Sequence, residues 1–439
     1  MNYTYSKYYF CAFLFLLTLK INAQFQILDH KRSVKLKFEV FNNLIILNGE
    51  INNQPKSFLL DSGVNKTVIF NSLSPQIDTT NIKEIRVMSL GNEKSVKAYL
   101  INATVNFKSF VNPKANLYYI TDKDWQLSNK LGIDIDGIIG YDFFKNHMVK
   151  IDYTRKIIKL YNPKKFRRQL RRYHKTSFQI NAGKPYLKAQ LTTDQNTHKN
   201  LDLLIDLGAS GSFWLIETDS IQKPIINYFD ILGYGLNQPI FGYRSKANSA
   251  KILGTKFKKP YYAFVPKSQI NPASFKDGLV GAEILRRFKL FINYPKNKLY
   301  TKPNKFIKDN FNYDKSGLIL NYAGKTYTTV YRQKPYRNTQ NLNKTPYDDL
   351  SSEKDTSSSF ISVDNIIIIA NIRPNSPASN TDLKIGDRIL SINNKAISKY
   401  NSQEINQLFS QDGNPEIKLK IQRKNKRLKV KFRLKSIFD

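Results

Sequence analysis

The chain has 439 residues, too many for one hydrophobic core, so two or three domains are expected. A hydrophobic fraction of 41% with 13% aromatic residues is typical of globular proteins and excludes a largely disordered chain. Lysine and arginine number 70 against 34 aspartates and glutamates, a formal net charge of +36, which favours adhesion to polyanions. Because the basic residues are spread along the whole chain, we interpret the charge as a compositional bias and predict no specific nucleic-acid partner.

The first 23 residues have the pattern of a secretion signal. Lys7 supplies a positive charge, residues 8–19 are apolar, and Ala23 is a small residue suited to a cleavage site. The apolar stretch is shorter than the roughly 20 residues that cross a bilayer, and no later segment is long enough. We therefore expect residues 1–23 to be a signal peptide and the mature chain to be periplasmic or extracellular, without a membrane span. The single cysteine, Cys11, lies in this segment, which excludes disulfides and thiolate metal sites from the mature chain.

Residues 24–162 alternate short β-like runs with turns. Residues 44–47 form one apolar run before Asn48-Gly49, and residues 86–100 are typical of a hairpin. Residues 141–148, after the turn at Gly140, predict one short helix. This part of the chain is therefore expected to form a β lobe.

The following residues repeat this organisation. A basic run at 164–175 separates the two parts, and we interpret it as a solvated connector rather than a polyanion site. Residues 176–305 again alternate apolar runs with turns, and glycines within 233–243 predict a second hairpin. A second β lobe is expected here.

Each of these parts carries a similar segment with an aspartate. Three apolar residues precede Asp61-Ser62-Gly63 in the first part and Asp206-Leu207-Gly208 in the second. An apolar-apolar-glycine element follows each, ending at Gly140 and at Gly281. The offsets are 206 − 61 = 145 and 281 − 140 = 141 residues. Repetition at a long, nearly fixed period indicates two similar lobes, each presenting one carboxylate.

The two aspartates suggest a specific hydrolytic chemistry. An isolated Asp-Ser-Gly is usually turn chemistry, so the prediction depends on the whole pattern occurring twice. If the lobes pair about a pseudo-twofold axis, Asp61 and Asp206 come into contact and share one proton. The ionised partner can take a proton from a water while the protonated partner donates to the substrate carbonyl oxygen. Such amide hydrolysis needs no metal and no cofactor, and we predict neither.

On these motifs, residues 24–305 resemble the pepsin and retropepsin group of aspartic proteases in a two-lobe bacterial form. The resemblance implies that Asp61 and Asp206 are the catalytic pair. It also implies support of the catalytic loops by residues beside them, namely Ser62, Gly63, Leu207, Gly208, Gly140 and Gly281. The hairpin at 86–100 lies where the family has its substrate-covering flap, which makes its central residues flap candidates, namely Leu90, Gly91 and Asn92.

Two departures from the family pattern affect the expected activity. The family has Thr or Ser after each catalytic Asp, where the hydroxyl joins the lobes; Ser62 can do this and Leu207 cannot. Pepsins also have a hydroxyl three residues after each Asp, at the positions of Val64 and Ala209 here. With fewer donors to the carboxylates we expect a less depressed pKa and activity at milder acidity.

The rest of the chain predicts a different domain. A stretch around 332–360 is rich in Asn, Thr, Asp and Ser and predicts a polar flexible insertion. Order returns with a buried strand at 366–369 and an amphipathic helix at 402–409. Residues 417–434 then alternate apolar and polar positions in two runs, which predicts a final hairpin.

Residues 376–378 (Ser-Pro-Ala) and 385–389 (Ile-Gly-Asp-Arg-Ile) make this region resemble a PDZ domain, as found appended to bacterial proteases. PDZ domains add an extended peptide to a sheet edge and hold its terminal carboxylate on loop amides. The resemblance implies a C-terminal peptide as ligand and the segment 316–320 as the carboxylate loop, with Gly317, Leu318 and Ile319 as candidate ligand-binding residues. The alternative is that 316–320 is only a strand after a turn.

We therefore expect a mostly β protein made of two pseudo-symmetric acid-protease-like lobes, 24–162 and 163–310, followed by a PDZ-like α+β domain, 311–439. The expected function is an exported, monomeric aspartic endopeptidase whose PDZ domain recruits a peptide or protein substrate. One alternative, favoured by Leu207, is a catalytically impaired pseudo-protease that binds peptides. Another, which depends on charge alone, is a polyanion-binding surface protein; the ionic-strength dependence of ligand binding would separate it from the other two.

Overall fold

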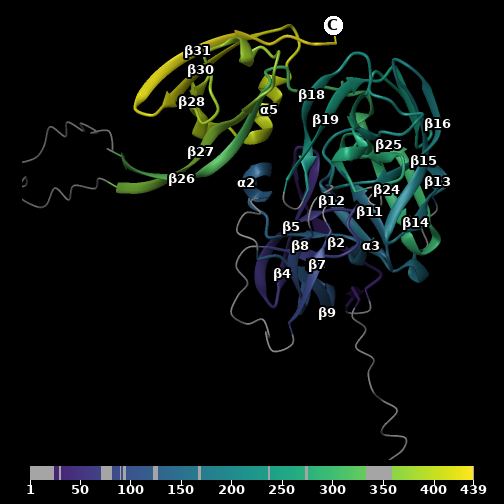
Figure 1. Cartoon of the computed structure of the whole chain (residues 1–439). Helices are drawn as coiled ribbons and strands as arrows, with labels where there is room; N and C mark the ends of the chain where they lie inside the picture. Colours follow the sequence, from purple (N-terminus) through teal and green to yellow (C-terminus); the bar gives the residue numbers. More distant parts are fainter. Residues whose placement is uncertain are drawn as a thin grey trace, which may run out of the picture. The chain divides into compact units, whose positions relative to one another are not determined.

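The structure, a computed structural model, describes residues 24–28, 31–70, 82–88, 90–91, 95–121, 127–166, 170–235, 238–271, 275–332 and 358–438. The predicted signal peptide, Asn92 and most of the predicted insertion lie outside the described residues. The fold is mostly β, as predicted (Figure 1). The chain forms two compact units. The first consists of Met1–Ser128, Ile133–Tyr313 and Ile437–Asp439, and the second of Asn129–Gly132 and Asp314–Ser436.

The first unit begins with a sheet built from the N-terminal part of the chain. Within the described residues this sheet has nine strands in the order β1-β9-β6-β10-β5-β4-β8-β7, with β3 paired to β4. The strands are β1 (Gln26–Ile27), β3 (Glu39–Phe41), β4 (Leu44–Ile51), β5 (Gln54–Leu60), β6 (Val68–Ile69), β7 (Lys83–Val87), β8 (Val96–Phe107), β9 (Phe110–Tyr119) and β10 (Gly137–Ile139). The short β10 runs parallel to β5, with Ile139 opposite Leu60.

A second sheet repeats this arrangement. Its ten described strands follow the order β18-β19-β22-β17-β23-β16-β15-β20-β21, with β14 paired to β15. They are β14 (Gln179–Asn181), β15 (Lys184–Thr192), β16 (Thr197–Ile205), β17 (Phe213–Ile216), β18 (Tyr228–Tyr234), β19 (Pro239–Lys246), β20 (Ser249–Ile252), β21 (Thr255–Lys258), β22 (Tyr261–Val265) and β23 (Gly278–Val280). Here β23 runs parallel to β16, with Val280 opposite Ile205, and β18 and β19 form the predicted second hairpin.

The two lobes share a third sheet. Its six described strands follow the order β13-β25-β24-β11-β12-β2. They are β2 (Ser33–Lys37), β11 (Met148–Asp152), β12 (Ile157–Tyr161), β13 (His174–Ser177), β24 (Phe288–Asn293) and β25 (Lys298–Pro303). The matched strands β11 and β24 pair antiparallel, with Val149 opposite Ile292 and Ile151 opposite Leu290. The pseudo-symmetric repeats therefore meet strand to strand, and one hydrophobic core runs through both lobes.

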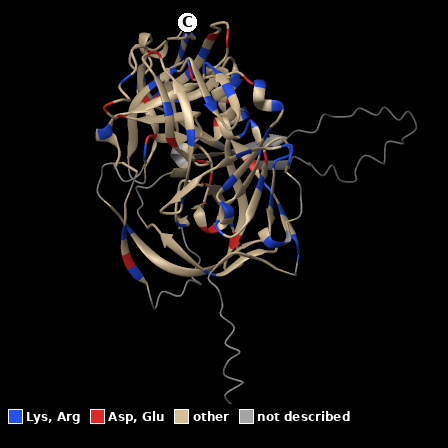
Figure 2. Ribbon diagram, turned by 90° about the vertical axis from the view of Figure 1, so that its right-hand side faces the viewer, with Lys and Arg blue, Asp and Glu red and all other residues tan. Residues whose placement is uncertain are grey.

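The helices described within the first unit are short. They are α3 (Tyr141–Phe144) and α4 (Ala282–Leu285), with short 3-10 turns such as η5 (Lys305–Lys308); α2 (Leu127–Leu131) begins in the first unit and ends in the second. The helix predicted at 141–148 was too long: it ends at Phe144 because Met148 already begins β11. None of the helices in the described part of the chain is long and apolar enough to cross a membrane. Lysine and arginine recur along many strands rather than in one segment (Figure 2).

The second unit contains a sheet and one α-helix from the C-terminal part of the chain. The sheet order is β26-β27-β28-β30-β31, with β29 on β28. The elements are β26 (Leu318–Arg332), β27 (Ser358–Ile372), β28 (Arg388–Ile392), β29 (Lys395–Ala396), β30 (Glu416–Arg423), β31 (Lys426–Arg433) and α5 (Ser402–Phe409). The helix predicted at 402–409 is confirmed, because Asn401 and Glu404 form a capping box at its start. The predicted insertion lies between the paired strands β26 and β27.

Candidate active site

Each candidate catalytic aspartate follows a buried strand. Asp61 comes directly after β5 and Asp206 directly after β16. The neighbouring parallel strand fixes the backbone at each aspartate: Asp61 N–H donates to the Ile139 carbonyl at 2.9 Å, and Asp206 N–H to the Val280 carbonyl at 3.0 Å. The sequence repeat therefore produces the same local structure twice.

The two aspartate loops meet across the lobes. A Cβ atom built on Gly208 would overlap the Asp61 carboxyl group, lying 2.8 Å from Oδ1. A Cβ atom on Gly63 would lie 3.1 Å from Cγ of Asp206. Glycine at these positions lets each loop approach the carboxyl group of the other lobe. The predicted pair, 145 residues apart in sequence, is thus brought together in one site.

Backbone amides and burial set the protonation of the pair. Gly63 N–H donates to Asp61 at 2.6 Å, while Gly208 and Ala209 donate to Asp206 at 2.8 and 3.2 Å. Burial raises the pKa of Asp61, and burial followed by the charge of Asp61 raises the pKa of Asp206 well above its ordinary value. The cause is burial, whereas the less depressed pKa expected from the sequence rested on missing hydroxyl donors at Val64 and Ala209, and that effect stays a prediction. Two carboxyl groups in this setting titrate as one unit and hold one proton between them.

A lysine that was not predicted from the sequence lies near the aspartate pair. Lys184 begins β15, and its amine lies 5.8 Å from the centre of the Phe275 ring. Its positive charge lowers the pKa of Asp61, while burial lowers the pKa of Lys184 itself against the charges of Asp206 and Asp61. The sequence could have indicated Lys184 only through comparison of the two lobes, because the matching strand of the first lobe, β4, begins with the apolar Leu44.

One side chain joins the two catalytic loops directly. The Ser62 hydroxyl donates to the Ile205 carbonyl at 2.7 Å and accepts from Leu207 N–H at 3.1 Å. Leu207 is fully buried in the hydrophobic core and has no hydroxyl with which to return this contact. The cross-lobe link expected for Ser62 is therefore present, and it is one-sided.

The remaining predicted support residues lie against the aspartate loops. Tyr141 N–H, after Gly140, donates to the Val64 carbonyl at 3.0 Å. Ala282 N–H, after Gly281, donates to the Ala209 carbonyl at 2.7 Å. A Cβ atom on either glycine would collide with these loop carbonyls. Each apolar-apolar-glycine element thus packs against the aspartate loop of its own lobe. Within the described residues, no group of three His, Cys, Asp or Glu side chains is arranged to hold a metal ion.

The predicted flap is a hairpin whose tip contacts the second lobe. Strands β7 and β8 pair antiparallel, with Val87 opposite Val96. The Leu90 carbonyl accepts from Asn271 N–H at 3.0 Å, and the Leu90 side chain packs against an apolar cluster of the second lobe that includes Trp214. Gly91 follows in the same tip, and Asn92 lies outside the described residues. Whether the hairpin covers a substrate stays a prediction.

The candidate carboxylate loop of the second unit differs from the expectation. Ser316 and Gly317 donate their N–H groups to the Asp314 carboxylate at 2.7 and 3.1 Å, and Leu318 N–H donates to the Ser316 hydroxyl at 3.0 Å. The amides expected to hold a ligand carboxylate are therefore already engaged by side chains of the loop. Ile319 follows in β26, which is one of the two edge strands of the described sheet. Asp314 is not among the residues predicted from the sequence, although an Asp two residues before a turn amide is a common capping pattern.

Two β lobes that bring one aspartate each into a shared buried site define an aspartic-protease-like unit. Residues 47–143 match the family described as Aspartyl protease, and residues 357–434 match the PDZ domain family. The search of curated proteins found no match to the chain. The chain thus contains an aspartyl protease domain and a C-terminal PDZ domain, which confirms the resemblance inferred from the motifs. The predicted boundaries between the domains stay predictions.

Proposed function

We propose that the chain is an aspartic-type endopeptidase in which Asp61 and Asp206 activate a water. The observation that carries the proposal is the meeting of the two carboxyl groups beside Gly63 and Gly208. Burial raises the pKa of both groups, which favours one proton shared by the pair. A singly protonated pair is the state that acid–base hydrolysis requires.

In the proposed reaction the ionised member of the pair takes a proton from water as the water oxygen attacks the peptide carbonyl carbon. The protonated member donates its proton to the carbonyl oxygen, which gives a neutral tetrahedral diol. The carbon–nitrogen bond then breaks as the nitrogen gains a proton from the pair and one hydroxyl returns a proton. The products are a carboxylic acid and an amine, and the pair ends with the single proton it began with. The amides of Gly63 and Gly208 hold the two carboxyl groups in place through these steps.

The second unit is proposed to recruit the substrate. Its edge strand β26 can accept an extended peptide by strand addition, which is how PDZ domains bind. We further propose export of the mature chain to the periplasm or the exterior, a role supported by the signal-like pattern of residues 1–23.

A second candidate function is a pseudo-protease that binds peptides without cleaving them. The observation that favours it is the one-sided lobe contact at Leu207. A peptide-library cleavage profile from about pH 3 to about 8, with and without a statine inhibitor, separates the two functions. Statine-sensitive cleavage supports the peptidase. Peptide binding with no cleavage at any pH supports the pseudo-protease.

A further inference from the structure

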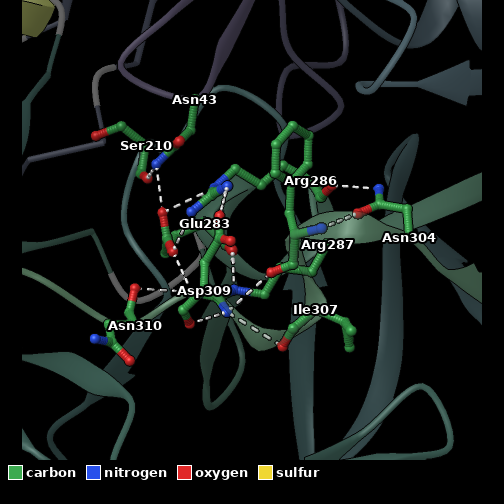
Figure 3. Close-up of polar contacts among 10 residues, drawn as sticks. Asn43, Ser210, Glu283, Arg286, Arg287, Asn304, Ile307, Asp309 and Asn310 are labelled. Carbon is green, nitrogen blue, oxygen red and sulfur yellow. Dashed lines mark hydrogen bonds and ion pairs between the residues drawn. The ribbon is translucent and has the colours of Figure 1, made fainter.

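A second polar contact joins the first lobe to the catalytic loop of the second. Asn43 lies in the turn between β3 and β4, and its side-chain amide donates to the Ser210 carbonyl at 3.0 Å and to the Glu283 carboxylate at 2.7 Å (Figure 3). Ser210 stands four residues after Asp206, on the same loop. Ala209, between them, donates its N–H to the Asp206 carboxylate at 3.2 Å. Asn43 therefore holds the loop that carries one of the two reacting carboxyl groups.

The acceptor of this contact is itself fixed. The Glu283 carboxylate accepts from Arg287 at 2.6 Å and from Arg286 at 3.0 Å (Figure 3). Arg287 is completely buried, and its guanidinium also donates to the Asp309 carbonyl at 2.6 Å. A buried, multiply bonded guanidinium has little freedom to move. Asn43 thus donates to a carboxylate whose position the second lobe determines.

The equivalent positions of the other lobe lack such contacts. The turn before β15 matches the turn before β4, and Gly183 stands there in the place of Asn43. Gly183 lies beside Tyr141 and Asn65, the counterparts of Ala282 and Ser210, but it has no side chain with which to bond them. Leu207 likewise replaces the hydroxyl that would match Ser62. At these two pairs of matched positions the first lobe therefore has a polar side chain, Asn43 or Ser62, where the second lobe has Gly183 or Leu207.

We propose that Asn43 is a positioning residue that holds the Asp206 loop against the first lobe and supplies the lobe contact that Leu207 cannot make. Its effect on turnover rests on the proposed peptidase function, whereas its effect on the loop does not. Without the contact, the Asp206 loop is held across the lobes by Ser62 and by apolar packing. The carboxyl groups then spend more time apart, and their shared proton is less well held.

A matched pair of variants tests this. Asn43 and Asn53 occupy the same kind of Asn-Asn hairpin turn with left-handed backbones, φ 70° and φ 64°, and Asn53 is exposed on the first lobe. Asn43→Gly and Asn53→Gly therefore remove the same side chain without backbone strain. Amide hydrogen exchange of a peptide covering residues 206–210 reports on loop opening. We expect roughly tenfold faster exchange in Asn43→Gly, because the variant loses about one hydrogen bond to a charged group. We expect no comparable change in Asn53→Gly. Equal exchange in the two variants would overturn the proposal.

Two further measurements separate positioning from simple destabilisation. Asn43→Gly should lower kcat more than it raises KM, because substrate contacts remain while the carboxyl pair loosens. Among the described ionisable groups, Asp61 acts on Asp206 through its charge, and the charge of Asp206 acts in turn on Lys184 and Tyr186, whose pKa values are shifted mainly by burial. If the pair loosens, the charge of Asp61 raises the pKa of Asp206 less, so the basic limb of the pH profile moves to lower pH. An Asn43→Gly variant with raised KM, unchanged kcat and an unmoved pH profile would contradict the proposal.

Rescue by a second substitution completes the test. In a Leu207→Thr background the new hydroxyl gives the lobes another link, so Asn43→Gly should accelerate loop exchange less than in the parent chain. If the effects of Asn43→Gly and Leu207→Thr on loop exchange were fully additive, Asn43 would not supply the contact that Leu207 lacks. If the parent chain shows no peptidase activity, the proposed function fails, while exchange and its rescue still decide the role of Asn43.

Discussion

The backbone N–H of Leu207 donates to the Ser62 hydroxyl 3.1 Å away, whereas the Leu207 side chain offers the first lobe no polar group. The cross-lobe hydroxyl contact is therefore present at Ser62 in the first lobe. At the matching position of the second lobe the apolar side chain of Leu207 cannot make it. A missing hydrogen bond of ordinary strength costs about 0.5–1.5 kcal/mol, part of which the packing of a buried leucine recovers. We infer weaker coupling between the lobes rather than a disrupted site.

Leu207→Thr should raise either thermal stability or kcat/KM, because the new hydroxyl can bond the first lobe. The smaller side chain also leaves a void, so the matched control is Leu207→Val, which has the shape of threonine without its hydroxyl. We expect the threonine variant to exceed the valine variant in Tm, measured by calorimetry, by the worth of about one hydrogen bond. Equal values for the two would show that the hydroxyl makes no cross-lobe bond. A threonine variant as inactive as a silent parent would favour the pseudo-protease.

Asp61→Asn and Asp206→Asn should each abolish peptide hydrolysis while leaving the fold intact, because either change removes the shared proton. The double variant should lose no more activity than the single ones, since the pair acts as one unit. Asp136 provides a control, as its carboxylate accepts from Ser57 N–H at 2.9 Å in the same lobe and takes no part in the pair. Asp136→Asn should lower stability and retain turnover per folded molecule. Substantial hydrolysis by a purified single variant of the pair would contradict the catalytic assignment.

The pH dependence tests the role of Lys184. Its charge favours the ionised form of Asp61 and so lowers the pKa of that carboxyl group. Lys184→Met removes this charge; the pKa of Asp61 rises further, and the acid limb of the kcat/KM profile should move to higher pH. Lys188, which is exposed on the same strand and pairs with Asp202 at 3.0 Å, is the matched control. Profiles of the two variants that coincide would show that Lys184 does not act on the pair.

The sequence sufficed for those parts of the fold that are encoded locally. The aspartate loops follow three-residue apolar runs and end in glycine, so their structure depends on few neighbours. The start of α5 could be predicted because a capping box lies in adjacent residues. The end of α3 could not, because its boundary depends on Met148 entering a sheet shared by both lobes. Competition from tertiary pairing is not visible in a short window of sequence.

Three residues of the described sites were not predicted from the sequence, and the reason is the same for each. Lys184, Asn43 and Asp314 are polar residues at turns, where the sequence alone gives them ordinary solvated roles. Their significance comes from what the fold places beside them: the aspartate pair, the Ser210 carbonyl and the amides of residues 316 and 317. Counterparts in the other lobe give a usable signal for the first two, because a polar residue replaces Leu44 or Gly183 at the matched position.

The Asp314 contacts predict which peptide ends the second unit accepts. Its carboxylate occupies the N–H groups of Ser316 and Gly317, so these two amides are not free to hold a ligand carboxylate. Peptides of a random library should therefore bind equally as free acids and as C-terminal amides, measured by fluorescence anisotropy. Asp314→Ala should restore a preference for the free acid, whereas Asp382→Ala, which removes the same charge from an exposed site, should not. A free-acid preference in the unaltered protein would show that a ligand displaces Asp314.

The residues that follow the second unit belong to the first unit, so the second unit can be excised while these residues are kept. Ile437 N–H donates to the Tyr313 hydroxyl at 2.8 Å, and the Phe438 ring lies 5.3 Å from the ring of Tyr313 and 5.5 Å from that of Tyr261. The chain thus leaves the first unit at Tyr313 and returns to the same tyrosine at Ile437. The polar stretch around 332–360 belongs to the second unit, between β26 and β27, and does not connect the two units in sequence.

Replacing residues 315–435 by a short Gly-Ser linker should therefore leave the first unit folded. If the second unit recruits substrate, KM for protein substrates should rise while kcat on short peptides stays nearly unchanged, because tethering acts through effective concentration. Phe438→Ala in the full chain is the control for the returning end; it should lower Tm through lost aromatic contacts and leave substrate preference unaltered. An equal loss of activity on short peptides and on proteins after the excision would show that the second unit stabilises the lobes instead of recruiting substrate.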